Sequence, residues 1–250
     1  MTHKARLVSG VLFAAMLAAS SAMALESGAM LPLMSDSVTG SYLAGRQALT
    51  DLRTEDAARY FRAAAAGDWD NPVIIERSFV ADTANGQIAE AARVAKHLLE
   101  LSAPNDLASL VIGAQAVKER RYGAAARELE SVGGDTFAGI TGGILRAWAL
   151  IGDGKRDEAD KVLDELGQGG LEDFLVFHRA LMADVEGRSA EALVLAKKAY
   201  EADPQVARIV EAYTRMLGNA GRFDEAEKVI ADFAAQGLDH PLIDAVKAKI

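Results

Sequence analysis

Apolar and polar residues follow a repeating pattern along most of this 250-residue chain. One alanine recurs at spacings of 34, 34, 34, 33 and 34 residues, and an apolar residue stands four and again seven positions after it each time. An apolar stripe at i, i+4 and i+7 is one face of an amphipathic helix, so each period predicts a helix that buries this face. The recurring alanines are Ala57, Ala91, Ala125, Ala159, Ala192 and Ala226.

A second position, 12 residues before each alanine, predicts another helix in every period. Small residues on two antiparallel helices let the helices approach closely, and turn-forming residues stand between the two positions. No stretch alternates with a period of two, as a half-buried strand would. Each period therefore predicts a helix, a turn and a second helix. The earlier position holds Gly45, Phe79, Gly113, Ala147, Ala180 and Thr214, where phenylalanine and threonine are the exceptions.

Prolines stand near the ends of several periods, at Pro72, Pro104, Pro204 and Pro241. The fixed φ of proline and its missing N–H suit a helix start or a stop just past a helix end. The pattern predicts six repeats within residues 38–240, namely 38–71, 72–105, 106–139, 140–173, 173–206 and 207–240, followed by a short segment at 241–250. That last segment is either a capping helix or the start of a further repeat, with Asp239 as a candidate N-cap.

A 34-residue helix-turn-helix period with glycine, alanine, a large apolar residue and proline at fixed offsets resembles the tetratricopeptide repeat. The first repeat is most similar to that family, with Gly45, Ala57, Phe61 and Ala64 on its small and aromatic positions. The early Trp or Leu and the mid-helix Tyr of the family are missing. The resemblance implies an all-α fold, a right-handed α-solenoid of about six units.

The same resemblance implies a concave groove lined by the first helices, at the second, fifth, ninth and twelfth positions of each repeat. These positions are mostly apolar in the three middle repeats and carry charged residues in the flanking ones. A large exposed apolar patch is typical of a partner site. The alternative is that a tightly wound solenoid packs the same side chains into its own core. The candidate groove residues are Leu107, Leu110, Ile144, Trp148, Ile151, Phe174, Phe177 and Leu181.

The N-terminus has the pattern of a secretory signal. Lys4 and Arg6 precede an apolar stretch, and Ala22-Met23-Ala24 is a small-residue cleavage site. We predict a signal peptide over residues 1–24, a linker over residues 25–37 and a periplasmic location. The alternative is an uncleaved anchor in the inner membrane, because the apolar stretch is close to the roughly 20 residues that span a bilayer.

Charge and composition exclude several functions. The net charge of -9 becomes -11 without residues 1–24, which argues against nucleic-acid binding. The chain has no cysteine, so disulfides, thiolate metal sites and cysteine nucleophiles are excluded. Its four histidines are isolated in sequence, and no zinc-protease, serine-hydrolase or phosphate-loop motif is present. We therefore expect no metal, no cofactor and no catalytic residue.

Together these patterns predict a non-enzymatic periplasmic scaffold that holds another envelope protein or peptide in its groove. The alternative within the same class is an accessory or recruiting subunit of an envelope export, polysaccharide-secretion or pilus-assembly machine. An enzyme with an unrecognised site is the alternative from another class. We expect no nucleic-acid partner and no stable membrane insertion after signal cleavage.

Overall fold

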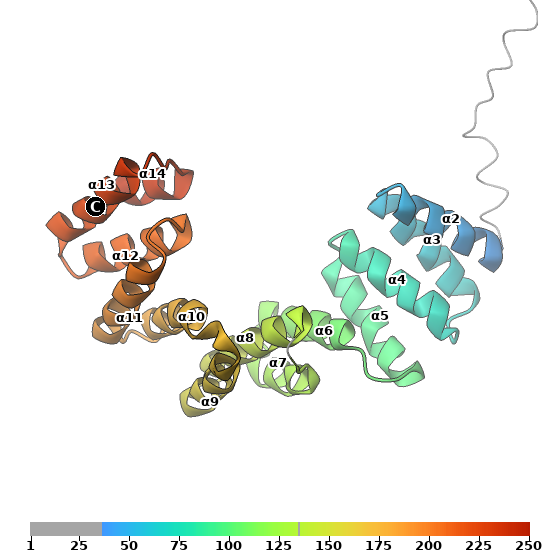
Figure 1. Cartoon of the computed structure of the whole chain (residues 1–250). Helices are drawn as coiled ribbons and strands as arrows, with labels where there is room; N and C mark the ends of the chain where they lie inside the picture. The colour runs from blue at the N-terminus through green and yellow to red at the C-terminus, as the bar shows by residue number, and fades with distance from the viewer. Residues whose placement is uncertain (1–36, 135) are drawn as a thin grey trace, which may run out of the picture. The chain divides into compact units, whose positions relative to one another are not determined.

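The computed structural model describes residues 37–134 and 136–250 (Figure 1). Throughout these ranges the regular structure is helical, without any strand, so the predicted all-α fold is confirmed. The chain divides into two compact units, one ending at Asn85 and the other beginning at Gly86. The predicted signal peptide and the linker up to residue 36 lie outside the described residues.

The N-terminal unit contains α2 (Val38–Thr50), α3 (Thr54–Gly67) and α4 (Pro72–Ala84). Ser37 caps α2 by accepting a hydrogen bond from the Gly40 amide at 2.9 Å. α2 and α3 lie side by side because Gly45 leaves room for a ring. A Cβ at Gly45 would lie 2.9 Å from the buried ring of Phe61. The small position predicted from the sequence is therefore a point of close helix contact.

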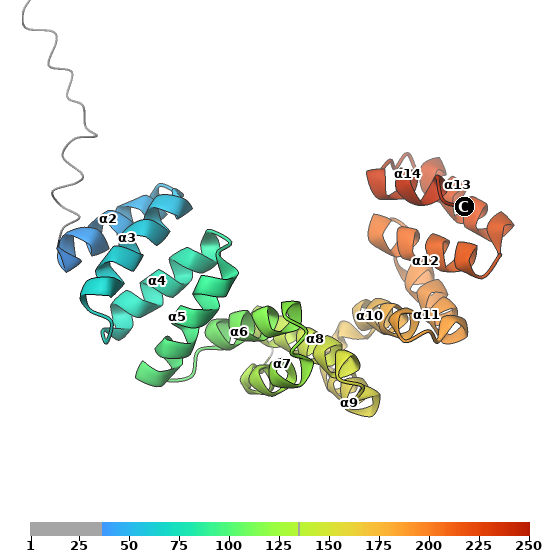
Figure 2. The same ribbon diagram turned by 180° about the vertical axis from the view of Figure 1, so that it is seen from behind.

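The C-terminal unit is a series of antiparallel helix pairs that Figure 2 shows from behind. Within it, α6 pairs with α7, α8 with α9, α10 with α11, and α12 with α13. Its elements are α5 (Ile88–Leu101), α6 (Asp106–Lys118), α7 (Tyr122–Glu128), the 3-10 turn η1 (Leu129–Ser131), α8 (Phe137–Gly152), α9 (Arg156–Leu166), the π-helical segment η2 (Gly167–Leu171), α10 (Glu172–Val185), α11 (Ser189–Ala202), α12 (Ala207–Asn219), α13 (Phe223–Ala235) and α14 (Pro241–Lys247).

The repeating alanines lie at the centre of the packing. All six are fully buried. The earlier small position is buried in every period as well, and even its two exceptions, Phe79 and Thr214, are fully buried. At Gly113 a Cβ would lie 2.5 Å from the side chain of Leu129, which stands four residues after Ala125. The sequence period is thus a period of side-chain contacts.

The turns that follow the first helix of each period share one backbone conformation. In the hairpin of α8 and α9, the amide of Lys155 donates to the carbonyl of Leu150 and the amide of Gly154 to that of Ile151. This pair of bonds is a Schellman motif, which places one residue in the left-handed region. That residue recurs with the period of the repeat, as Leu52, Gly86, Arg120, Gly154, Gly187 and Gly221, all with φ between 57° and 75°.

The hairpin of α8 and α9 is joined to its neighbours differently from the others. α7 is only seven residues long, and the chain then passes Gly133 and Gly134 before α8 begins. On the other side, η2 connects α9 to α10 through three glycines, of which Gly170 has φ 85°. Neither connection contains a proline. Elsewhere, Pro104 and Pro204 lie in the connections before α6 and α12, and Pro72 and Pro241 are the first residues of α4 and α14.

The C-terminal helix corrects one prediction. Asp239 is not the N-cap of α14, because the side chain of His240 accepts the hydrogen bond from the Leu242 amide at 3.1 Å. α14 packs on α12 and α13 and buries Ile243 and Val246.

Candidate functional site

The eight predicted groove residues lie on α6, α8 and α10 of the C-terminal unit. We call them the apolar stripe: Leu107 and Leu110 on α6, Ile144, Trp148 and Ile151 on α8, and Phe174, Phe177 and Leu181 on α10. None of the eight is buried. Phe174 is 52% exposed and Leu107 is 43% exposed, while the other six are partly exposed. Their helix neighbours Ala147 and Ala180 are fully buried, so the stripe is the outward edge of the packed face.

Three residues of the stripe meet around a histidine. The ring of His178 lies 5.1 Å from that of Phe174 and 6.4 Å from that of Phe177, centroid to centroid, and 6.5 Å from the ring of Trp148. The contacts with Phe174 and Trp148 are edge-to-face, a favourable arrangement for aromatic rings. We call these four residues the aromatic cluster. It joins α8 to α10, which come from successive hairpins.

A hydrogen bond fixes the chemical state of the histidine. Trp148 Nε1 donates to His178 Nδ1 at 3.2 Å, so Nδ1 must carry a lone pair and the ring proton stands on Nε2. Burial also lowers the pKa of His178, because desolvation penalises the charged imidazolium. Both effects favour a neutral ring at pH 7.

Most side chains of the apolar stripe pack against the hydrophobic core. Ile144, Trp148 and Ile151 pack against a buried cluster to which all the helices from α6 to α10 contribute side chains. Phe177 packs on Val176, Ala199 and Ile209, and Leu181 packs on the core of the last hairpins. Each of these side chains thus has one packed side and one exposed side. The structure places Leu107 and Leu110 on α6, outside the aromatic cluster.

Beyond Leu181, charged side chains replace the apolar ones. Arg215 Nη1 lies 2.8 Å from an Asp184 carboxylate oxygen, and its Nε lies 3.5 Å from Glu211. Arg208 pairs with Glu211 at 3.1 Å. These four residues hold positions on α10 and α12 that follow the same spacing as the stripe. The apolar surface therefore ends in a set of mutually paired charges.

His178 is not among the eight predicted residues, because in the sequence it lies far from any other histidine. Its spacing carried a signal, since position i+4 from Phe174 lies on the same helix face. Its contact with Trp148, 30 residues away, depends on how two hairpins stack, which spacing within one helix does not reveal.

Residues 37–134 and 136–250 contain no group of three or more His, Asp or Glu side chains placed to hold a metal ion. In the same part of the chain, every helix is too short or too polar to cross a membrane.

Comparison with known proteins supports the repeat. Residues 186–250 match the tetratricopeptide repeat family model. A tetratricopeptide repeat protein from Parabacteroides merdae has 15% identity and a TM-score of 0.57, over 84% of this chain and 82% of its own. PilF of Pseudomonas aeruginosa has 15% identity and a TM-score of 0.54, over 88% of this chain and 100% of its own. No curated protein sequence matches the chain. The chain thus carries a tetratricopeptide repeat match over residues 186–250 and shares the fold of solved proteins of this repeat type.

Proposed function

We propose that the protein is a non-enzymatic scaffold that binds a partner protein or peptide on the apolar stripe. The observation that carries the proposal is the aromatic cluster, in which an exposed Phe174 stands on side chains fixed by the core and by the Trp148 hydrogen bond. Fixed aromatic side chains lose little conformational entropy on binding and contribute a large share of interface energy. The paired charges at the end of the stripe would form a polar rim.

The chemistry of the cluster supports binding rather than catalysis. The Nδ1 atom of His178 accepts from an indole N–H, whereas a catalytic imidazole is usually oriented by a carboxylate at that nitrogen. The surrounding rings of Phe174 and Phe177 offer no nucleophile. The surface is suited to holding an apolar or aromatic side chain of the partner.

A matched pair of phenylalanines tests this proposal. Phe174 on α10 and Phe223 on α13 are 52% and 50% exposed. We expect Phe174→Ala and Phe223→Ala each to change the melting temperature by less than about 2 °C, because exposed substitutions affect stability little. Only Phe174→Ala should reduce partner capture, measured by cross-linking in an envelope extract and quantitative mass spectrometry. Equal capture by both variants would place the binding surface elsewhere.

The cellular setting is a separate proposal. The basic, apolar and small-residue segments of residues 1–24 support export to the periplasm with signal cleavage after Ala24. N-terminal sequencing of the mature protein tests this, because an intact Met1 in the membrane fraction would instead indicate the anchor. A role as an accessory subunit of an envelope export or assembly machine is the narrower form of the same scaffold proposal, and the identity of the captured proteins decides it.

A further inference from the structure

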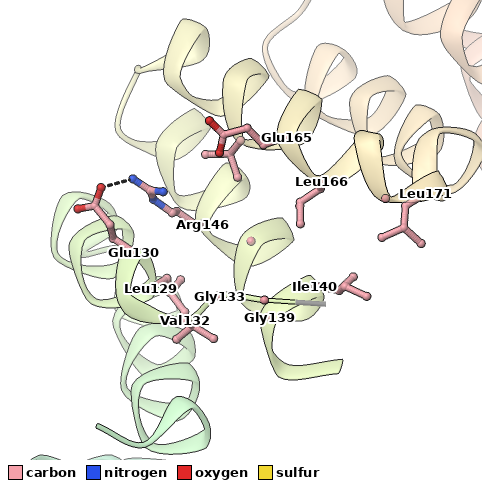
Figure 3. A pocket seen from close by; sticks show the side chains of 14 residues that line it. Leu129, Glu130, Val132, Gly133, Gly139, Ile140, Arg146, Glu165, Leu166 and Leu171 are labelled. Atoms are coloured by element: carbon pink, nitrogen blue, oxygen red, sulfur yellow. Dashed lines mark hydrogen bonds and ion pairs between the residues drawn. The ribbon is translucent and has the colours of Figure 1, made fainter. Parts of the chain in front are cut away.

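A pocket of about 530 Å³ lies beside α8 and shares no residue with the apolar stripe; Figure 3 shows the side chains that line it. Gly139, Gly143 and Arg146 line it from the face of α8 opposite to Ile144 and Trp148, and Ile140 lines its edge one turn before Ile144. Leu129, Val132, Ile140, Leu166 and Leu171 form its apolar wall, and the figure shows these side chains around the opening.

The sequence explains why this space is left unfilled. α7 ends at Glu128, so it is half the length of α5 or α11, and the side chains of a further helical turn are missing. Glycines replace them: nothing lies within 4 Å of a Cβ built at Gly133 or at Gly169, two of the residues that line the pocket. The irregular connections on both sides of the α8–α9 hairpin therefore create the cavity.

Three charged residues line the pocket, and they leave it net negative. Arg146 Nη2 pairs with Glu130 at 2.6 Å, as the dashed line in Figure 3 marks. Glu165 is exposed and forms no ion pair within residues 37–134 and 136–250. The Nε atom of Arg146 is buried and has no hydrogen-bond acceptor there. An occupant could thus place a cation near the exposed Glu165, whereas the buried Nε of Arg146 is out of its reach.

We propose that this pocket binds a peptide segment of a partner protein that carries a bulky apolar side chain beside a lysine or arginine. The apolar side chain fills the space between Val132, Ile140 and Leu171. The cationic side chain pairs with the exposed carboxylate of Glu165. The net charge of -9 also attracts a basic segment at long range. This site is independent of the apolar stripe.

The test uses three blocked hexapeptides, Gly-Leu-Xaa-Phe-Leu-Gly, in which Xaa is lysine, norleucine or glutamate. Binding is followed by NMR of the isotope-labelled full chain, through the backbone amides of the pocket glycines and the indole N–H of Trp148. We expect the lysine peptide to shift the glycine signals and to bind most tightly, and the glutamate peptide to bind least. The glycines observed are Gly133, Gly134, Gly139, Gly143 and Gly169.

Two variants and their controls locate the interaction. Glu165→Gln should weaken the lysine peptide about threefold, as expected for an exposed ion pair, and leave the norleucine peptide unchanged. Glu158→Gln, on the same helix and outside the pocket lining, should change neither. Ile140→Trp should fill the space and abolish binding, whereas Val194→Trp on α11 should not.

Three outcomes would overturn the proposal. One is an absence of glycine shifts with every peptide at millimolar concentration. Another is equal binding of the lysine and glutamate peptides. The third is a response confined to Trp148, which would assign the peptides to the apolar stripe and leave the scaffold function intact. A loss of capture by Phe174→Ala tests that function alone, so the two proposals can fail separately.

Discussion

At the scale of single residues, two turns place a residue other than glycine in the left-handed backbone conformation. Glycine fills the left-handed position in three hairpins and in the turn after α4, but Leu52 and Arg120 adopt φ of 57° and 58° in two further hairpins. A side chain in that conformation is strained by roughly 1 kcal/mol or more, because its Cβ crowds the following carbonyl. Both side chains are exposed, so substituting either residue removes few packing contacts.

We predict that Arg120→Gly raises the free energy of unfolding by about 1 kcal/mol, because glycine relieves the strain. The matched change Gly154→Ala should lower it by a similar amount, since it introduces the same strain at the equivalent position. Urea unfolding of both variants measures these effects. Arg120→Ala serves as the control, because it shortens the side chain and keeps the strain. If it stabilises as much as Arg120→Gly, the left-handed conformation is not the cause.

A second residue-scale prediction concerns His178 and pH. Burial lowers the pKa of this group in the folded state, so the unfolded chain binds the proton more readily. The free energy of unfolding is therefore highest above about pH 6.5, the pKa of His178 in the unfolded chain. It declines as the pH falls from there through the lower pKa of His178 in the folded protein. His178→Gln retains an acceptor for Trp148 and does not titrate. The melting temperature of the wild type should thus fall more between pH 7.5 and 5.5 than that of His178→Gln. Equal falls would show that His178 is not responsible.

At the scale of helices, much of the architecture could be predicted, because each helix follows from spacing within one period. Glu186-Gly187 lies in the turn between the paired helices α10 and α11, and Asn85-Gly86 lies between the end of α4 and the start of α5. Acidic residues such as Asp224 and Glu225 stand in the first turn of α13, where the helix dipole favours them. Glu225 also pairs with Arg222 at 2.5 Å. A structural role accounts for these carboxylates.

The shortening of α7 was harder to predict. Gly133 and Gly134 are residue types typical of a loop, but the apolar period continues through Val132, seven residues after Ala125, and Val132 is buried. The sequence pattern thus locates the buried residues of the third repeat without showing that its second helix ends early at Glu128. The pocket depends on missing side-chain volume, and a pattern of residues that are present does not reveal such a space.

At the scale of the whole molecule, most contacts join helices that are neighbours in sequence. Repeat proteins of this kind derive their stability from each repeat and from its interfaces with adjacent repeats. The position of the apolar stripe could be predicted because it follows from that regularity. The aromatic cluster could be predicted only in part. The repeat spacing predicts Trp148, Phe174 and Phe177, whereas the contact of His178 with Trp148 depends on how two hairpins stack.

The glycine connections on either side of the α8–α9 hairpin also affect how often this hairpin opens. Segments held by fewer constraints open more often without global unfolding, and their amide hydrogens exchange sooner. We therefore expect α8 and α9 to exchange with deuterated water faster than α12 and α13, as followed by mass spectrometry. Gly169→Ala, which meets no neighbouring atom, should slow this exchange by restricting the open state. The hairpin that supplies Trp148 would then exchange before the α12–α13 hairpin, and equal exchange in the two hairpins would contradict this expectation.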